Sequence, residues 1–390
     1  LLIMRKLFFI LPIFFTIQSF AQERNWTLNG YVKDLFMYYH PKQELPGLDI
    51  NNLATNTIHN RLNFKWYTSD QFTIAIEMRN RIISGSLVKE FQDYQSIIDV
   101  DNGYFDLSAV PFDGKSWFMH SMIDRAFIDW TSGKWQIRAG RQRVNWGINS
   151  VWNPNDVFNS FSYFDFDYEE RPGSDALRVQ YYMGMTSSAE IVYKLGENAD
   201  EMALAGLVRF SQWDYDFQFI GGWVGEDIVI GTGWSGDIQG GGFRGEITHF
   251  MPRKQNSVSK KATVASISGD YTFPNSVYIQ ASALYNSHGK SGKAGGLDPL
   301  SNDNLSAKFL SFAKYSLFGQ VSYPITPLFN GSFSGIINPG DGSFYFGPAL
   351  TYSLQDNLEL MLTGQLFFGE EGSEFGDIGQ LVFGRLKWSF

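Results

Sequence analysis

The chain has 390 residues, no cysteine, 39 glycines and a formal net charge of −9 at pH 7. The lack of cysteine excludes a disulfide framework and thiol chemistry. The acidic balance argues against nucleic acid as a partner, because phosphate binding requires clustered cations. A helical membrane protein needs apolar runs of roughly 18 residues, and this sequence has none, so we expect a soluble protein or a β-barrel.

The first residues predict a secretory signal peptide over residues 1–21. Arg5 and Lys6 precede an apolar run that is too short to span a membrane, and small residues follow it. We therefore expect cleavage after Ala21. The rest of the chain, 22–390, is predicted to form a single domain.

The following residues read as strands of about 8 to 13 residues in which apolar and polar side chains alternate. In the clearest of them, Ile58, Leu62 and Phe64 share one face, while Arg61 and Lys65 share the other. Such segments number about eighteen, within a range of 16 to 18. The pattern predicts an all-β protein, an antiparallel transmembrane β-barrel.

The lengths of the predicted connections alternate along the chain. Short turns are expected near residues 69, 133, 186, 213, 274, 325 and 356. The long connections are expected at 39–56, 84–120, 143–174, 251–261, 287–305 and 369–377. If the first strand starts in the periplasm, the barrel has short periplasmic turns and long extracellular loops, as outer-membrane barrels do.

The last strand, residues 380–390, places Val382, Leu386, Trp388 and Phe390 on one face. This ending resembles the C-termini of outer-membrane barrels, where a terminal aromatic residue is read by the barrel-assembly machinery. The resemblance implies an integral protein of the bacterial outer membrane, exported through its signal peptide. Outer-membrane lipid and the barrel-assembly machinery are the partners that we expect.

Cations concentrate on the strand faces that the alternation assigns to the lumen. They are Arg61, Lys65, Arg79, Arg81, Arg125, Arg138, Arg178, Arg209, Arg244, Arg385 and Lys387. A barrel of this size should enclose water, and arginine rings in a pore favour anions. Alternatively, Glu77, Asp129, Glu190 and Glu246 share those faces and neutralise the arginines across neighbouring strands.

Acidic residues gather in the predicted loops. One group lies within the predicted 143–174 connection or directly after it: Asp156, Asp165, Asp167, Glu169, Glu170 and Asp175. We expect these carboxylates to be solvated on the outer side of the membrane.

The most distinctive segment is 137–161. Gly140, directly after an arginine-bearing strand, predicts a bend or a close backbone approach. The segment resembles porin-like barrels of the alginate-export type, whose Arg-x-Gly-Arg-Gln and Trp-Gly pattern is matched by Arg138, Gly140, Arg141, Gln142, Trp146 and Gly147. The resemblance implies passive passage of a polar or anionic solute or a saccharide through the lumen, with the loop at 145–159 folding inward as a constriction. A loop that only packs inside the barrel and stiffens it is the alternative.

These patterns predict an outer-membrane channel for small polar or anionic solutes. The predicted pore-lining residues are Arg61, Arg79, Arg81, Arg125, Arg138, Arg141, Gln142, Arg178, Arg209 and Arg244. The alternative function is a structural or partner-binding subunit of an outer-membrane export or surface-assembly complex. The five histidines lack metal-ligand spacing and no Gly-x-Ser-x-Gly elbow occurs, so we expect no catalytic residue, metal site or cofactor. The pattern leaves the oligomeric state open.

Overall fold

The computed structural model describes residues 25–42, 52–91, 93–254, 259–295 and 306–390, so the predicted signal peptide lies outside the described residues. The chain forms two short helices and nineteen strands. In chain order they are β1 (Trp26–Pro41), β2 (Leu53–Tyr67), β3 (Phe72–Gly85), α1 (Ser86–Glu90), α2 (Tyr94–Ile98), β4 (Ser108–Gly114), β5 (Trp117–Ser132), β6 (Trp135–Gln142), β7 (Ser174–Tyr182), β8 (Ser188–Lys194), β9 (Ala203–Gln212), β10 (Tyr215–Val224), β11 (Asp227–Ile238), β12 (Gly241–Pro252), β13 (Ala262–Thr272), β14 (Tyr278–Asn286), β15 (Tyr315–Thr326), β16 (Phe329–Ile337), β17 (Phe344–Gln355), β18 (Leu358–Phe368) and β19 (Gly379–Ser389). Within the described ranges, no helix is both long and apolar enough to cross a membrane.

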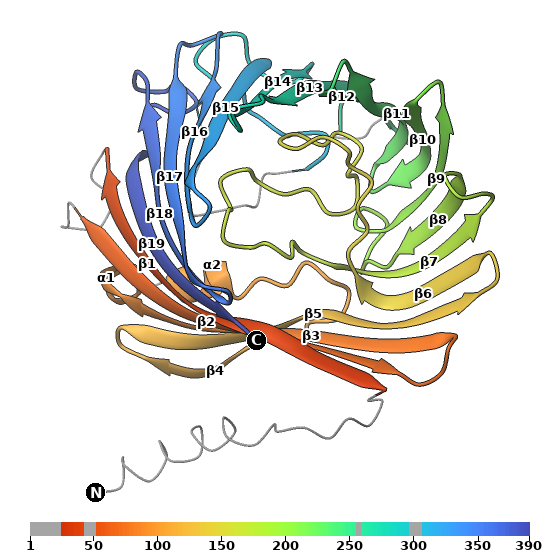
Figure 1. Ribbon diagram of the computed structural model, residues 1–390, viewed down its shortest axis with the longest axis horizontal. Coiled ribbons are helices and arrows are strands. Elements are labelled where there is room, and N and C mark those ends of the chain that lie inside the picture. The colour runs from red at the N-terminus through yellow and green to blue at the C-terminus, as the bar shows by residue number, and fades with distance from the viewer. Residues whose placement is uncertain (1–24, 43–51, 92, 255–258, 296–305) are drawn as a thin grey trace, which may run out of the picture.

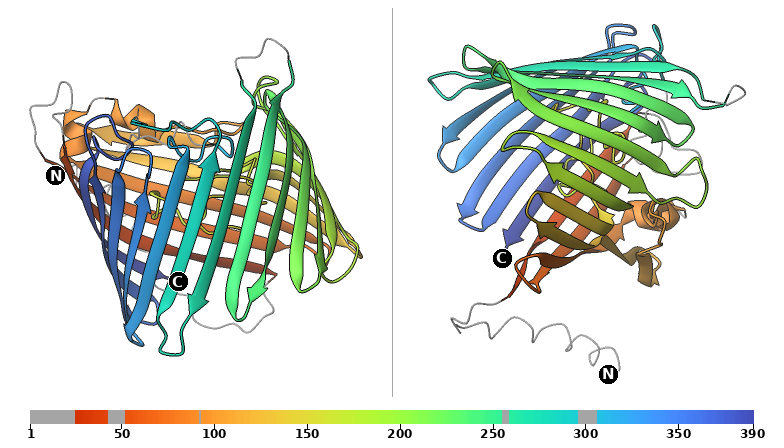
Figure 2. Two further views of the ribbon diagram at one scale, coloured as in Figure 1. Left: turned by 90° about the horizontal axis from the view of Figure 1, so that it is seen from above. Right: turned by 90° about the vertical axis from the view of Figure 1, so that its right-hand side faces the viewer.

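The strands form one antiparallel sheet that closes on itself, because β1 pairs with both β2 and β19 (Figure 1). Strand β3 pairs directly with β5. Strand β4 pairs with the first residues of β5, 117–122, on the opposite edge of β5. The closed wall therefore contains every strand except β4, which makes eighteen. This confirms the predicted barrel and its strand number. The strands run obliquely around the wall (Figure 2).

Consecutive strands of the wall are antiparallel, so their connections fall at alternate ends of the barrel. One end has tight turns, such as residues 133–134, 213–214 and 356–357. The other end has the long connections, including 86–116 and 143–173. A further tight turn at 239–240, which the sequence pattern did not predict, has positive φ angles at both residues (54° and 86°), as a two-residue hairpin turn of this kind requires.

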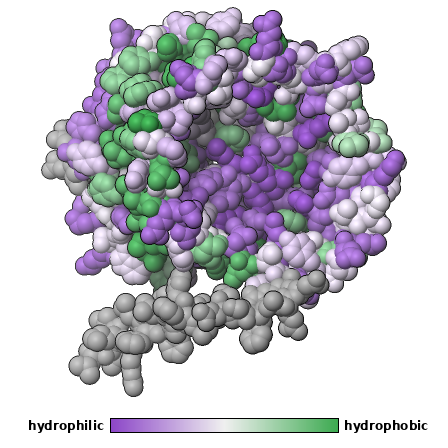
Figure 3. All heavy atoms as spheres, viewed as in Figure 1, coloured by the Kyte–Doolittle hydropathy of each residue, from purple (hydrophilic) through white to green (hydrophobic). Residues whose placement is uncertain are grey.

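Side-chain alternation separates an apolar outer surface from a polar lumen. Figure 3 shows hydrophilic residues gathered in the hollow of the barrel and hydrophobic residues on its flank. Exposed large apolar residues on the outward positions include Ile58, Ile128, Phe219, Leu317, Phe333 and Leu362. Because side chains of a strand point alternately to its two faces, the residues between them point into the barrel.

A β-bulge in β5 changes this alternation at one point. Glu77 pairs with Arg125, but the next residue of β3, Met78, pairs with Ile123, so Asp124 has no partner opposite it. A bulge of this kind re-aims side chains, and here Asp124 and Arg125 are both buried although they are consecutive. The bulge therefore adds a carboxylate to the inner wall.

Candidate functional site

The connection between β6 and β7, residues 143–173, lies inside the barrel, where Figure 1 shows it running through the interior. We call it the constriction loop. Its first part is attached to the wall by backbone groups. The fully buried carboxylate of Glu246 on β12 accepts hydrogen bonds from the backbone N–H groups of Ile148 (2.5 Å), Asn149 (2.8 Å) and Asn155 (2.8 Å). One glutamate thus satisfies three backbone donors.

Trp146 adds an aromatic contact to this anchor. Its ring is buried, packs edge-on against Phe158 at 4.8 Å between centroids, and donates from Nε1 to Glu190 at 2.8 Å. The backbone carbonyl of Trp146 accepts from Gln218 at 2.7 Å. The predicted inward fold of residues 145–159 is therefore what the structure shows.

The middle of the loop packs against an aromatic part of the wall. Tyr163 lies 5.1 Å from the ring of Phe318, and Phe164 lies 5.1 Å from Tyr345 and 5.3 Å from Phe367. Aromatic pairs at these separations stabilise a contact beyond the area that they bury. The loop therefore crosses from the β8–β13 side of the lumen to the β15–β18 side.

The last part of the loop carries its acidic residues onto β19, β1 and β2. Asp167 contacts Lys33 at 2.8 Å, and Glu169 contacts Lys387 at 2.8 Å. Burial alone would raise the pKa of Asp167, but contacts with His59 and Lys33 hold that pKa below its ordinary value. The expectation that these carboxylates are solvated on the outer side is wrong for Asp156 and Asp175, which are buried, and for Asp167, which pairs with the buried Lys33 inside the barrel. Glu169 stays exposed, but it too contacts a cation of the inner wall.

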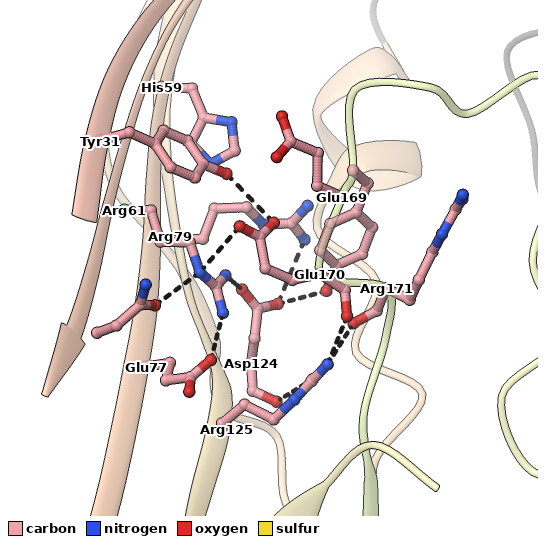
Figure 4. Close-up of polar contacts among 12 residues, drawn as sticks. Tyr31, His59, Arg61, Glu77, Arg79, Asp124, Arg125, Glu169, Glu170 and Arg171 are labelled. Carbon is pink, nitrogen blue, oxygen red and sulfur yellow. Dashed lines mark hydrogen bonds and ion pairs between the residues drawn. The ribbon is translucent and has the colours of Figure 1, made fainter. Parts of the chain in front are cut away.

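Arg61 of β2 is the centre of this charged network (Figure 4). Its fully buried guanidinium contacts Asp124 at 2.5 Å, Glu77 at 2.8 Å and Glu170 at 3.3 Å. Tyr168 of the loop donates to the same Asp124 at 2.6 Å. The bulge residue Asp124 is therefore a link between wall and loop that the strand pattern did not reveal.

The predicted pore-lining arginines that belong to strands of the wall lie on its lumenal side. Most of them have partners. Arg138 contacts Asp129 at 2.6 Å, and Arg178 contacts Glu190 at 2.8 Å. Other predicted residues are engaged as follows: Arg244 with Asp270, Arg125 with the backbone carbonyls of Asp124, Glu170 and Arg171, and Arg209 with Gln218. The cross-strand pairing considered from the sequence is thus present for several arginines.

Arg141 and Gln142 are the last two residues of β6, and both contact neighbouring segments of the chain. Arg141 binds Asp101 at 2.6 Å and Asp175 at 2.8 Å, which joins the β3–β5 connection to β7. Gln142 is fully buried, and its amide donates to three backbone carbonyls, including that of Ala176 at 2.9 Å. Gln142 therefore supports the wall, whereas Arg141 also borders a cavity.

Gly140 has the special backbone geometry that its position predicted. Its φ of +116° favours glycine, and an added Cβ would lie 2.2 Å from the carbonyl oxygen of Ala126. We expect Gly140→Ala to destabilise the barrel by about 1–3 kcal/mol, because strain and steric overlap add. Urea unfolding in lipid vesicles measures this. Gly184→Ala, which meets no atom within 4 Å, is the control and should be nearly neutral.

A cavity of about 300 Å³ lies between β3, β5, α2 and the constriction loop. Its charged and aromatic lining comprises Arg79, Arg81, Asp101, Asp124, Arg141, Phe161, Asp165 and Tyr168. Arg79 stacks over the ring of Tyr168 at 4.0 Å and reaches Asp124 only at 3.7 Å. Arg81 contacts His120 at 2.9 Å and, among the described residues, has no carboxylate within ion-pair distance. Both arginines therefore have fewer carboxylate contacts than Arg61, which has three.

A second, wider cavity of about 640 Å³ lies toward the end with the long loops. Lys194, Glu197, Asp200 and Lys308 are among its lining residues. It shares Asp101 and Asn102 with the cavity of Arg79 and Arg81, so the two cavities adjoin.

No protein-family model and no curated protein sequence matches the chain. Solved structures are similar in fold. OccAB4 of Acinetobacter baumannii has a TM-score of 0.61 at 9% identity, covering 95% of this chain and 99% of that one. OprD of Pseudomonas aeruginosa has a TM-score of 0.59 at 10% identity, covering 94% and 95%. OccK5 (OpdH) of the same species has a TM-score of 0.57 at 10% identity, covering 94% and 97%.

These similar proteins are outer-membrane porins with eighteen-stranded barrels. The narrower resemblance to the alginate-export type is not supported by the comparisons and stays a prediction. At such low identity the likeness concerns architecture. The chain has the closed eighteen-stranded barrel fold of outer-membrane porins.

Proposed function

We propose that this protein is an outer-membrane channel for the passive passage of small polar or anionic solutes. The observation that carries the proposal is the pair Arg79 and Arg81, which line a cavity beside the constriction loop. Arg79 reaches a carboxylate only at 3.7 Å, and Arg81 reaches none within ion-pair distance among the described residues. A guanidinium in a confined polar site offers several donors to an anion. The adjoining wider cavity supplies an entry from the end with the long loops.

The orientation in the membrane belongs to the same proposal. The tight turns face the periplasm and the long loops face outward, as is usual for such barrels. Phe390, whose backbone pairs with Gly30 at 3.0 Å in both directions, then lies at the periplasmic end. Export through the predicted signal peptide and assembly through the last strand complete this proposal.

Replacing Arg79 and Arg81 together with alanine should reduce anion preference. Removing two cations from a narrow pore lowers the local positive potential, and we expect the chloride-to-potassium permeability ratio to fall by about threefold or more. Reversal potentials of the reconstituted channel across a KCl gradient measure this ratio. The control is Lys115→Ala combined with Lys134→Ala, which removes two exposed cations outside the lumen.

Two results would contradict the proposal. An unchanged ratio in the arginine variant would refute a role of these side chains in selection. A correctly folded barrel that never conducts would refute the channel and favour the alternative, a structural subunit whose lumen is closed by its own constriction loop.

A further inference from the structure

The inner wall beneath the acidic part of the constriction loop brings cations into direct register. Lys33 of β1 pairs with Lys387 of β19. Arg61 of β2 pairs with Arg79 of β3. Like charges directly opposite one another destabilise a sheet. A wall with this pattern therefore requires counter-charges from outside the sheet.

The constriction loop supplies counter-charges, because Asp167, Glu169 and Glu170 make ion pairs with cations of the wall. We define the cationic wall by the cations that face loop residues 165–170: Lys33, Arg61, Arg79, Arg81, Arg125, Arg385 and Lys387. The carboxylates of the same wall are Glu77, Asp124 and Glu359. Seven cations and three carboxylates leave a formal charge of +4. Segment 165–170 carries four carboxylates, so its formal charge is −4.

The contacts between the two combine ion pairs with two hydrogen bonds that Lys33 and Arg125 donate to the backbone carbonyls of Asp167 and Glu170. Glu169 reaches Lys387 at 2.8 Å and Arg385 at 3.4 Å, and Glu170 reaches Arg61 at 3.3 Å (Figure 4). A soluble anion can offer the same carboxylate or phosphate oxygens to these cations. It cannot replace the backbone N–H groups that hold the first part of the loop on Glu246. The acidic part of the loop is therefore the exchangeable part.

We propose that residues 165–170 act as an internal pseudo-ligand, which occupies a binding surface for multivalent anions and is displaced by them to widen the pore. This inference rests on the proposed channel function. A tethered segment competes at a high effective concentration, so an anion with a single charged group should not displace it. An anion with three or more linked carboxylates or phosphates matches several wall cations at once and therefore binds the displaced state preferentially.

The first test uses the full-length channel in planar bilayers. Citrate and tripolyphosphate are compared with acetate and monophosphate at equal ionic strength in KCl. We expect citrate, tripolyphosphate or both to raise the unitary conductance by about twofold, while acetate leaves it unchanged. A response to citrate alone indicates that the cationic wall binds linked carboxylates, and a response to tripolyphosphate alone indicates that it binds linked phosphates. A conductance that only falls with the multivalent anions, or that rises equally with acetate, overturns the inference.

The second test removes the pseudo-ligand. Asp167→Asn, Glu169→Gln and Glu170→Gln combined should give a channel that is already wide, prefers anions more strongly and no longer responds to citrate or tripolyphosphate. The matched control, Asp216→Asn with Asp237→Asn and Asp270→Asn, removes three carboxylates from strands outside the cationic wall and should keep the response. A response retained by the first variant overturns the inference.

A reversible lock covers the case in which the triple variant fails to fold. The chain has no cysteine, so Glu169→Cys with Lys387→Cys can be joined by a short thiol-specific cross-linker. Cross-linking should abolish the multivalent-anion response, and cleavage of a reducible linker should restore it; a response that persists overturns the inference. A wild-type channel that conducts but ignores every anion refutes the pseudo-ligand alone, whereas a barrel that never conducts refutes the channel itself.

Discussion

Replacing Glu246 with leucine should release the first part of the constriction loop and produce a larger, noisier single-channel conductance. The buried carboxylate accepts three backbone N–H groups, from Ile148, Asn149 and Asn155. Each of these hydrogen bonds contributes between about 0.5 and 3 kcal/mol, depending on whether the carboxyl is ionised, so the attachment should weaken by several kcal/mol. Leucine also leaves three donors without an acceptor, which makes the docked loop costly to keep. Single-channel recording at pH 7 measures the outcome.

Glu359→Gln is the matched control for this variant. Glu359 is also a lumenal glutamate, but it contacts Arg385 of the neighbouring strand. The control should keep the wild-type conductance. If Glu246→Leu folds as a barrel and conducts like wild type, the loop does not limit the pore.

Alkaline pH should loosen the constriction loop through Asp156. Burial raises the pKa of this carboxyl to about 8. The charge of Arg143 lowers this pKa and the charge of Glu246 raises it. Because the pKa is raised in the docked state, the protonated carboxyl contributes its full stabilisation to docking below pH 3.8, the ordinary pKa of aspartate. This stabilisation is lost progressively as the pH rises toward 8. Ionising a fully buried carboxyl costs several kcal/mol, because each unit of pKa shift corresponds to about 1.4 kcal/mol. We therefore expect conductance and current noise to rise between about pH 7 and 9.

Asp156→Asn isolates this group, because asparagine has a similar shape and does not ionise. The variant should show no alkaline transition and should keep the narrow conductance at pH 9. Arg253 on the exposed rim provides a comparison: its change to glutamine should leave the transition in place. An alkaline transition that persists in Asp156→Asn would assign it to another group.

Much of the barrel follows from local pattern. The period of two fixes which side chains face lipid and which face the lumen, since a shift of one residue would move every apolar side chain to the wrong face. For this reason Arg61, Arg138 and Arg178 were assignable to the lumen without a structure. The special geometry of Gly140 was visible for a similar reason, because a glycine beside a strand end has few other uses.

The partners of those arginines were not assignable in the same way. Asp124 breaks the alternation through a bulge, and the pattern contains no sign of where an extra residue enters a strand. Pairing of Glu246 with an arginine was one of two alternatives, but Glu246 accepts backbone groups of a loop nearly a hundred residues away in the chain. Such contacts depend on the path of a loop through space, which local propensity does not encode.

The sequence by itself determined the closed barrel, the polarity of its two surfaces and the cations of its lumen, because strand periodicity repeats in every segment. Only the tertiary structure decided which charges meet. Segment 165–170 is rich in carboxylates whether it is solvated or docked, and its composition is compatible with both. Docking follows from the rows of cations that β19, β1, β2 and β3 bring together across the sheet. Their mutual repulsion exists only once the barrel has closed, and it is relieved by the acidic loop inside it.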